Sequence, residues 1–202
     1  MTLWLSVLVA CVLNGAPSES EASNSGSARR EFERALAEPD AAKRAEAIVL
    51  FLDRGDPSLH VEVHRAWENC GKAALPVLYS LVADESRTDR DSLLGTLVRA
   101  GGKDCVPNLV RLLKDECVYW NNLGMNLDEE SKIPQSRVQF LVDLLTHLNV
   151  FAYRDNQGLV RGVRDRFRDH PLLCNYGKRT EAGAPVGASP VVQTAGAILA
   201  RP

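Results

Sequence analysis

One short stretch of sequence occurs twice in this chain. Residues 71–85 are GKAALPVLYSLVADE and residues 102–116 are GKDCVPNLVRLLKDE. Glycine, lysine, proline, two leucines, aspartate and glutamate recur at matched positions. A period of roughly 30 residues is typical of chains in which one helical unit packs on the next. The repeat therefore predicts a stack of helical units, and it predicts that specific function depends on the exposed positions at which the copies differ.

The composition supports an all-helical fold. Of 202 residues, 45% are hydrophobic and 25% are charged, which is typical of one modest globular domain with tails. Leucine and alanine alternate with charged residues, and long β-branched alternations of the kind found in strands are missing. The net charge of −2 provides no overall basic field that would attract nucleic acid.

Hydrophobic spacing predicts helices over 29–37, 41–53, 57–70 and 89–100, in both copies of the repeat, and over 134–149 and 156–168. Residues 117–133 interrupt this pattern, and we expect a long acidic loop there. The helical domain is predicted to span 29–174. Residues 175–202 are rich in glycine, alanine and proline, which predicts a disordered tail with at most a weak apolar contact at 195–199.

The repeat resembles HEAT repeats, a family of paired antiparallel helices. The resemblance rests on the G-K-x-x-[LV]-P start and the L-x-x-L-[VL]-x-D end of each copy, and on Asp84 followed six residues later by Arg90. It implies a right-handed α-α superhelix of about three helix pairs, in which such an Asp and Arg connect neighbouring repeats. The chain departs from the pattern after the second copy, where Asn121 stands in place of the arginine.

Stacked repeats present their second helices as a continuous concave surface, which predicts a protein-binding or scaffold function. The helical faces would place polar and aromatic residues on that surface: Tyr79, Ser80, Asn108, Arg111, Lys114, Gln139, Asp143 and His147. Tyr119 and Trp120 would form an aromatic anchor at its rim or, equally, a plug covering the last repeat. We expect another protein as the partner, no nucleic acid, no cofactor and no metal.

Two other classes of function stay open. HEAT-like folds serve as cofactor lyases and as DNA-repair glycosylases, so the resemblance leaves an enzyme as an alternative, although the expected face is mixed in charge. A purely structural subunit of the cell envelope is the other alternative. His60 and His64 have the spacing of two metal ligands on a helix, with Glu68 one turn further on. We favour the interpretation that they are ordinary, partly exposed histidines.

The last predicted helix carries a basic row formed by Arg161, Arg164 and Arg168. Such a row could bind an anion or neutralise the acidic segment 117–133 within the same molecule. A solvated helix face is the more common outcome for three basic residues at this spacing, and we expect a structural role here.

The N-terminus predicts export. Residues 2–13 are TLWLSVLVACVL, which is too short to span a bilayer as a helix but has the length of a secretory hydrophobic region. Within it, residues 8–11 resemble a bacterial lipobox, which would make Cys11 the lipidated residue and the protein a membrane-tethered lipoprotein. Residues 1–28 would then comprise the signal and a flexible tether. The alternatives are a mis-set start codon or an apolar N-terminus that packs on the domain.

Four further cysteines could form two disulfides in an exported chain, and the least strained pairing is Cys70 with Cys105 and Cys117 with Cys174. We favour the interpretation that Cys70 and Cys105 are small, reduced core residues, because no spacing among the cysteines matches a metal or redox motif.

Overall fold

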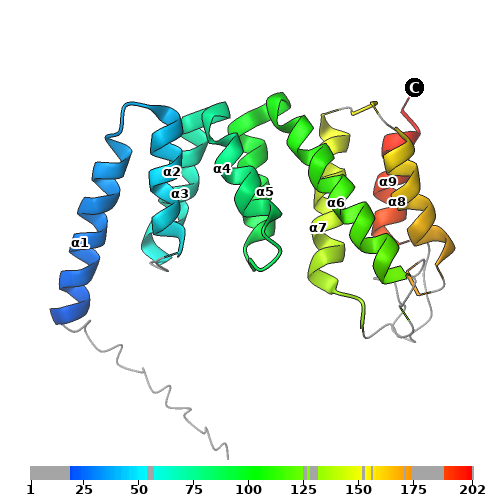
Figure 1. The fold of residues 1–202 in the computed structure, drawn as a ribbon, viewed down its shortest axis with the longest axis horizontal. Coiled ribbons are helices and arrows are strands. Elements are labelled where there is room, and N and C mark those ends of the chain that lie inside the picture. The colour runs from blue at the N-terminus through cyan, green and yellow to red at the C-terminus, as the bar shows by residue number, and fades with distance from the viewer. Residues whose placement is uncertain are drawn as a thin grey trace, which may run out of the picture.

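The computed structural model describes residues 19–53, 57–124, 127, 132–151, 153–155, 157–170, 172–173 and 189–201. Throughout these residues the regular structure is helical, which confirms the all-α prediction (Figure 1). The α-helices are α1 (Glu19–Leu36), α2 (Ala41–Asp53), α3 (Pro57–Cys70), α4 (Leu75–Ala83), α5 (Arg90–Gly101), α6 (Val106–Gly124), α7 (Gln135–Val150), α8 (Gln157–Asp169) and α9 (Pro190–Leu199). Two short 3-10 helices, η1 (Gly71–Ala74) and η2 (Gly102–Cys105), precede α4 and α6.

Consecutive helices pack as pairs along one long direction of the molecule, from α1 at one end to α8 and α9 at the other (Figure 1). Contacts join α2 to α3, α4 to α5, α6 to α7, and α8 to α9. Between pairs, α3 packs on α5, α5 on α7, and α7 on α9, while α6 packs on α8. Two rows of helices therefore enclose one hydrophobic core between them, and the described residues form four pairs where the sequence predicted about three.

The two copies of the repeat form the same structure, a tight turn that leads into a helix. Gly71 and Gly102 each adopt a positive φ, of 59° and 53°, a region that residues with a Cβ rarely occupy. The chain then makes one 3-10 turn before α4 and α6, whose second residues are the prolines of the two copies. Proline is tolerated there because the first N–H groups of a helix have no intrahelical partner. The matched leucines of both copies are buried or packed against the core.

Helices α1 to α3 form one end of the row. Asp40 caps α2, because its Oδ1 accepts hydrogen bonds from the backbone N–H groups of Ala42 and Lys43 at 2.9 and 3.1 Å. The buried Trp67 of α3 donates its indole N–H to the backbone oxygen of Ala45 at 2.9 Å. This hydrogen bond fixes the packing of α3 against α2.

Helix α1 is longer than the sequence indicated. The tether predicted for residues 1–28 is wrong from residue 19 onward, because α1 begins at Glu19. Residues 26–28 already belong to the same helix as Phe32, which is buried against Phe51 of α2 with ring centroids 5.2 Å apart. Residues 1–18, including Cys11, lie outside the described residues.

Helix α6 also extends beyond its prediction. It continues to Gly124, so the loop expected for residues 117–133 is wrong over 117–124. The last two turns of α6 follow the helical period: Glu116 and Trp120 are buried, whereas Val118, Asn121 and Asn122 are exposed. Of the remaining segment the structure describes only residues 127 and 132–133.

The disordered tail predicted for 175–202 is wrong over 190–199, which form α9. Ser189 caps this helix, its Oγ accepting from the backbone N–H of Val192 at 3.4 Å, and Pro190 takes the first helical position. Val191, Ala195 and Ile198 are buried against α7 and α8. The alanine-rich composition suggested disorder, yet this small apolar face suits close packing between two longer helices. Residues 174–188 lie outside the described part of the chain.

Of the helices that the structure describes, none combines the length and the apolar character needed to cross a membrane.

Candidate functional site

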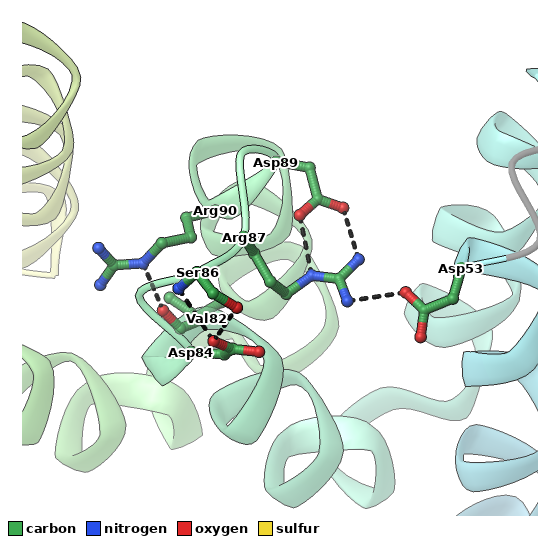
Figure 2. A network of polar contacts seen from close by, with 7 residues as sticks. All are labelled: Asp53, Val82, Asp84, Ser86, Arg87, Asp89 and Arg90. Carbon is green, nitrogen blue, oxygen red and sulfur yellow. Dashed lines mark hydrogen bonds and ion pairs between the residues drawn. The ribbon is translucent and has the colours of Figure 1, made fainter.

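The turn between α4 and α5 connects three helix pairs through two arginines. Arg87 and Arg90 leave this turn in opposite directions (Figure 2). Arg87 reaches back to the end of α2, where its Nη1 lies 2.8 Å from Asp53 Oδ1, and it also binds both carboxylate oxygens of Asp89 at 2.9 and 3.0 Å. The turn is thereby joined to the preceding pair.

Arg90 reaches forward to the next pair. Its Nε donates to the backbone oxygen of Val82 at 2.8 Å, and its Nη2 lies 3.7 Å from Glu116 Oε1 on α6. The guanidinium stacks on the ring of Phe140 of α7 at 4.1 Å from the centroid. The HEAT resemblance implied that Asp84 and Arg90 connect repeats. The arginine does so, but Asp84 stays within its own turn, where it accepts from the N–H and the hydroxyl of Ser86.

Glu116 is a buried carboxylate with a complete set of donors. Its side chain is 2% exposed. Besides the ion pair with Arg90, it accepts from Arg137 Nε at 2.9 Å and from the indole Nε1 of Trp120 at 3.1 Å. Burial raises the pKa of this carboxyl above its ordinary value, and the guanidiniums of Arg137 and Arg90 oppose that shift. With two cations within ion-pair distance, the carboxylate balances charge that would otherwise be buried alone.

Arg137 joins both copies of the repeat. While its Nε binds Glu116, its Nη2 donates to Glu85 Oε1 at 2.7 Å. The guanidinium lies over the ring of Tyr119 at 3.4 Å from the centroid. Its side chain is 10% exposed, whereas that of Glu85 is 58% exposed. The hydrogen bond from Arg137 lowers the pKa of Glu85. Two arginines, Arg90 and Arg137, are thus balanced by two carboxylates, one buried and one at the surface.

A pocket of about 370 Å³ opens beside these groups, between the α4–α5 turn and the start of α7. Its walls combine guanidiniums, carboxylates, hydroxyls and two aromatic rings: Glu85, Ser86, Arg87, Thr88, Arg90, Asp91, Tyr119, Pro134, Ser136, Arg137 and Phe140. Helix α7 begins at this wall, and its N-cap Pro134 provides no side-chain hydrogen bond to the first turn. The pocket therefore brings aromatic surface, buried charge and an uncapped helix start together at one place, and we take it as the candidate site.

Other hollows lie toward the ends of the row, among them one of about 370 Å³ lined by residues of α6 and α8, including Asn121 and Arg166. One of about 570 Å³ is lined by α1, α2 and α3, including Phe32, Arg44 and Arg65. A smaller one of about 180 Å³ lies between α6 and α8 and is lined by Trp120, Phe167 and two glycines of α8. Among the residues that line these hollows, none forms a buried ion pair comparable with that of Glu116.

The residues predicted for one concave surface lie in three separate places. Tyr79, Arg111 and Lys114 belong to α4 and α6; the Arg111 guanidinium lies 4.7 Å from the centroid of the Tyr79 ring, and Lys114 is exposed nearby on α6. Tyr119 lines the pocket described above. Trp120 is 1% exposed and donates into the core, so the exposed anchor predicted for it is wrong and its alternative role in packing holds.

The third group lies on α7, in the other row of helices. Gln139 is exposed and donates to Asp143 Oδ1 at 2.9 Å, and His147 follows one turn later, half-buried. Helix α7 packs on α5. Burial and the charge of Asp143 on α7 raise the pKa of Asp91 on α5, and burial and the charge of Arg99 on α5 lower the pKa of His147 on α7. Burial lowers the pKa of His147, with Asp143 opposing and Arg99 adding to the effect.

The histidine pair of α3 has a local partner. The Thr96 hydroxyl lies 2.6 Å from His64 Nδ1 and 3.1 Å from the backbone oxygen of Ser92, and its oxygen accepts from Arg99 Nη2 at 3.1 Å. His64 also packs edge-on against Trp67, with centroids 5.8 Å apart. Within the described residues, no group of three or more His, Cys, Asp or Glu side chains is arranged to hold a metal ion.

The basic row of α8 pairs largely with acids of its own helix. Arg164 binds Asp165 at 2.8 Å, and Arg168 binds Asp165 at 3.2 Å and Asp169 at 2.6 Å. These contacts fit the structural role that we preferred for the row. The acidic residues of the segment that it was proposed to neutralise, Asp128, Glu129 and Glu130, lie outside the described residues.

The cysteines that the structure describes are free. Cys70, Cys105 and Cys117 carry free thiols, so the pairing of Cys70 with Cys105 is wrong, and the preferred interpretation of Cys70 and Cys105 as reduced, buried residues is confirmed. Burial raises the pKa of the Cys105 and Cys117 thiols to about 11 in each case. Cys174, the proposed partner of Cys117, lies outside the described residues.

Sequence reasoning missed most of the pocket. The spacing of Asp84 and Arg90 marked one of its arginines, but Arg87, Arg137 and Phe140 carried no motif. One signal was present: each copy of the repeat ends in glutamate, and a charge that recurs at the end of an apolar helical face needs a partner. That signal did not indicate which of the two glutamates is buried.

Comparisons of the chain with protein-family models, with curated proteins and with solved structures give no significant match.

Proposed function

We propose that this protein is a protein-binding module built from a HEAT-like superhelical stack of helix pairs, and that its partner docks at the pocket between the α4–α5 turn and α7. The stack is supported by the repeated stretch in the sequence and by packing that joins each helix pair to the next. In this proposal the buried ionic cluster fixes the position of the pocket walls, and the pocket mouth is the recognition surface.

The observation that carries the proposal is the pairing of two of the three pocket arginines with aromatic rings. Arg90 lies on Phe140 and Arg137 on Tyr119, and all four residues line the same hollow. Arginine and aromatic residues dominate the energetics of protein interfaces, particularly in preformed recesses from which water is displaced. A recess of about 370 Å³ has room for one large side chain or a short chain end of a partner.

The test uses two exposed serines as matched positions. Ser136 lines the pocket, whereas Ser80 is exposed on α4 near Tyr79 and Arg111, on the surface first predicted from the sequence. Ser136→Trp would fill the pocket mouth, and Ser80→Trp would add the same bulk to the other surface. Both variants and the unmodified chain would be tagged, shown to have the same thermal midpoint, and used to capture proteins from the native source with quantitative mass spectrometry.

We expect at least one protein to be captured by the unmodified chain and by Ser80→Trp, and to be lost with Ser136→Trp. The interaction should then be reproduced with that protein purified. Loss with Ser80→Trp and retention with Ser136→Trp would contradict the pocket and favour the α4–α6 surface. Identical capture by all three proteins would contradict a role for either surface.

We also propose, from residues 2–13 alone, that the chain is exported and tethered through a lipid on Cys11. Mass spectrometry of the mature N-terminus from the native source tests this proposal. A chain that begins with lipidated Cys11 would support it, and an unprocessed Met1 would contradict it.

A further inference from the structure

We propose that the pocket binds a carboxylate of the partner, and that Glu85 occupies the place of that carboxylate in the free protein. This inference rests on the proposed function, because it specifies the chemistry recognised at the same pocket. In this proposal the Arg137 guanidinium releases Glu85 and binds the carboxylate of the partner in its place.

The first argument concerns burial. Both side-chain hydrogen bonds of the Arg137 guanidinium go to carboxylates, but Glu116 is 2% exposed and Glu85 is 58% exposed. Glu116 also accepts from Trp120 and lies 3.7 Å from Arg90, so it is fixed by its surroundings. Glu85 has no comparable enclosure, and an ion pair of this exposed kind adds little to stability. Glu85 is therefore the partner of Arg137 that another carboxylate can replace, whereas Glu116 is not.

The second argument concerns charge balance. Arg90 interacts with Glu116 and with Asp91 of the same pocket, whereas the carboxylate partners of Arg137 are Glu116 and Glu85. If Glu85 swings out without replacement, Arg137, whose side chain is 10% exposed, loses one of its two carboxylate partners. A neutral or cationic ligand would not replace that partner, whereas a carboxylate restores the balance. The ligand that displaces Glu85 must therefore bring one negative charge.

The third argument concerns the geometry around the vacated position. The start of α7 forms one wall, and its N-cap Pro134 supplies no side-chain hydrogen bond to the first-turn N–H groups. The partial positive charge of a helix start favours an anion. The hydroxyl of Ser136 and the ring of Tyr119 line the same pocket. A carboxylate attached to an apolar or aromatic group fits these walls better than a bare inorganic anion, because the ring of Tyr119 already covers one face of Arg137.

Such a carboxylate can come from the C-terminus of the partner or from an internal acidic side chain. N-acetyl-L-phenylalanine serves as the probe for a chain end, and N-acetyl-L-glutamic acid α-amide serves as the probe for a side chain. N-acetyl-L-phenylalaninamide, which lacks the carboxylate, is the neutral control. Binding would be followed by NMR titration of the full chain labelled with ¹⁵N, using the backbone amides of Ser136, Arg137 and Thr88.

Glu85→Gln removes the competing carboxylate and leaves its size unchanged. We expect at least one of the two acidic probes to bind at the pocket in the millimolar range, about fivefold more tightly to Glu85→Gln than to the unmodified chain. The neutral amide should not bind to either. Asp115→Asn is the matched control, because it removes one charge from the equivalent end of the other copy, at an exposed residue adjacent to Glu116. Its affinity for the probes should equal that of the unmodified chain.

The probe that binds identifies the source of the carboxylate. Equal affinity of Glu85→Gln and the unmodified chain, an equal gain in Asp115→Asn, or no binding of either acidic probe to Glu85→Gln would overturn the exchange. These results are separable from the proposed function: if Ser136→Trp abolishes partner capture while the acidic probes fail, the pocket binds a protein through other chemistry.

Discussion

Glu85 and Glu116, the final residues of the two copies of the repeat, bind the same guanidinium, that of Arg137. Equivalent residues in a repeat usually have equivalent surroundings. Here one glutamate is largely exposed and the other is buried, because α6 continues beyond the repeat and α7 folds over it. The two carboxylates therefore have the same position in the repeat, but we expect them to contribute differently to the free energy of unfolding.

The first prediction compares these two glutamates. Glu116→Gln should lower the free energy of unfolding by about 3 kcal/mol, because it leaves two poorly exposed guanidiniums with too little negative charge. Glu85→Gln should lower it by about 0.5 kcal/mol, as expected for a pair with an exposed partner. Urea unfolding followed by circular dichroism measures both values. Equal losses in the two variants would show that the buried position of Glu116 confers no special role.

The second prediction concerns the C-terminal helix. Ile198→Ala should destabilise the protein by about 3 kcal/mol, because it leaves a cavity where α9 packs on α7 and α8. Ala197→Ser changes an exposed neighbour on the same helix and should alter the free energy of unfolding by less than about 0.5 kcal/mol. Thermal melts of the two variants check this. If Ile198→Ala melts like the unmodified chain, α9 does not contribute to the core.

The third prediction applies one substitution at two glycines. A Cβ at Gly101 would lie 2.5 Å from Leu75 Cδ2 and 2.9 Å from Cys105 Cβ, so Gly101→Ala should cost about 2 kcal/mol. A Cβ at Gly162 in α8 would meet nothing within 4 Å, so Gly162→Ala should stabilise the protein by up to about 1 kcal/mol through better helix propensity. The measured quantity is the midpoint of urea unfolding, and shifts of the same sign in both variants would contradict the packing described here.

The fourth prediction concerns acid sensitivity. Burial lowers the pKa of both His64 and His147. A histidine with a lowered pKa takes up its proton more readily in the unfolded chain than in the folded one. The stability is therefore fully present above about pH 6.5, the pKa of an unfolded histidine, and is lost as the pH falls through the lower pKa of the folded protein. The urea midpoint should therefore decrease between about pH 7.5 and about pH 5.5.

Titration of the histidine ring protons by NMR gives the two pKa values directly, and both should be below about 6.5. His147→Gln should show a weaker decrease of the urea midpoint over the same range, because one of the two lowered groups is gone. A pKa at or above the ordinary value for either ring would contradict the burial described for that residue.

The sequence predicted the helices best where apolar spacing and turn residues agreed. The limits of α2, α3, α5, α7 and α8 lie within one or two residues of those predicted. In these segments glycine, proline or a capping aspartate marks the helix ends, so local signals and packing specify the same boundaries.

Two of the segments that were predicted wrongly pack on neighbouring helices. Trp120 in 117–124 is buried, and so are Val191, Ala195 and Ile198 in 190–199. Trp120 illustrates this: the sequence left its role open between an anchor and a plug, and the buried carboxylate of Glu116 fixes it as a hydrogen-bond donor in the core. Tertiary contacts of this kind are not encoded by the local pattern.

The site was predicted least well because its residues come from distant parts of the chain. Arg137 lies 52 residues from Glu85 and 21 from Glu116, and no short motif spans such separations. Periodicity assigned the exposed positions of α4, α6 and α7 to one surface, but α7 belongs to the other row of helices. The pairing of helices, which the sequence did not specify, decides which exposed residues become neighbours.

Chains built from units that touch only their neighbours are able to unravel from an end, one unit after another. The guanidinium of Arg137 works against this in the middle of the molecule. Peeling α7 away would leave Glu116 without its closest cation, so the loss of one unit immediately weakens the unit before it. We expect the two central pairs to melt as a single cooperative block, with stepwise fraying confined to the outer helices. The arginine that shapes the pocket would then also determine the size of the smallest fragment able to stay folded.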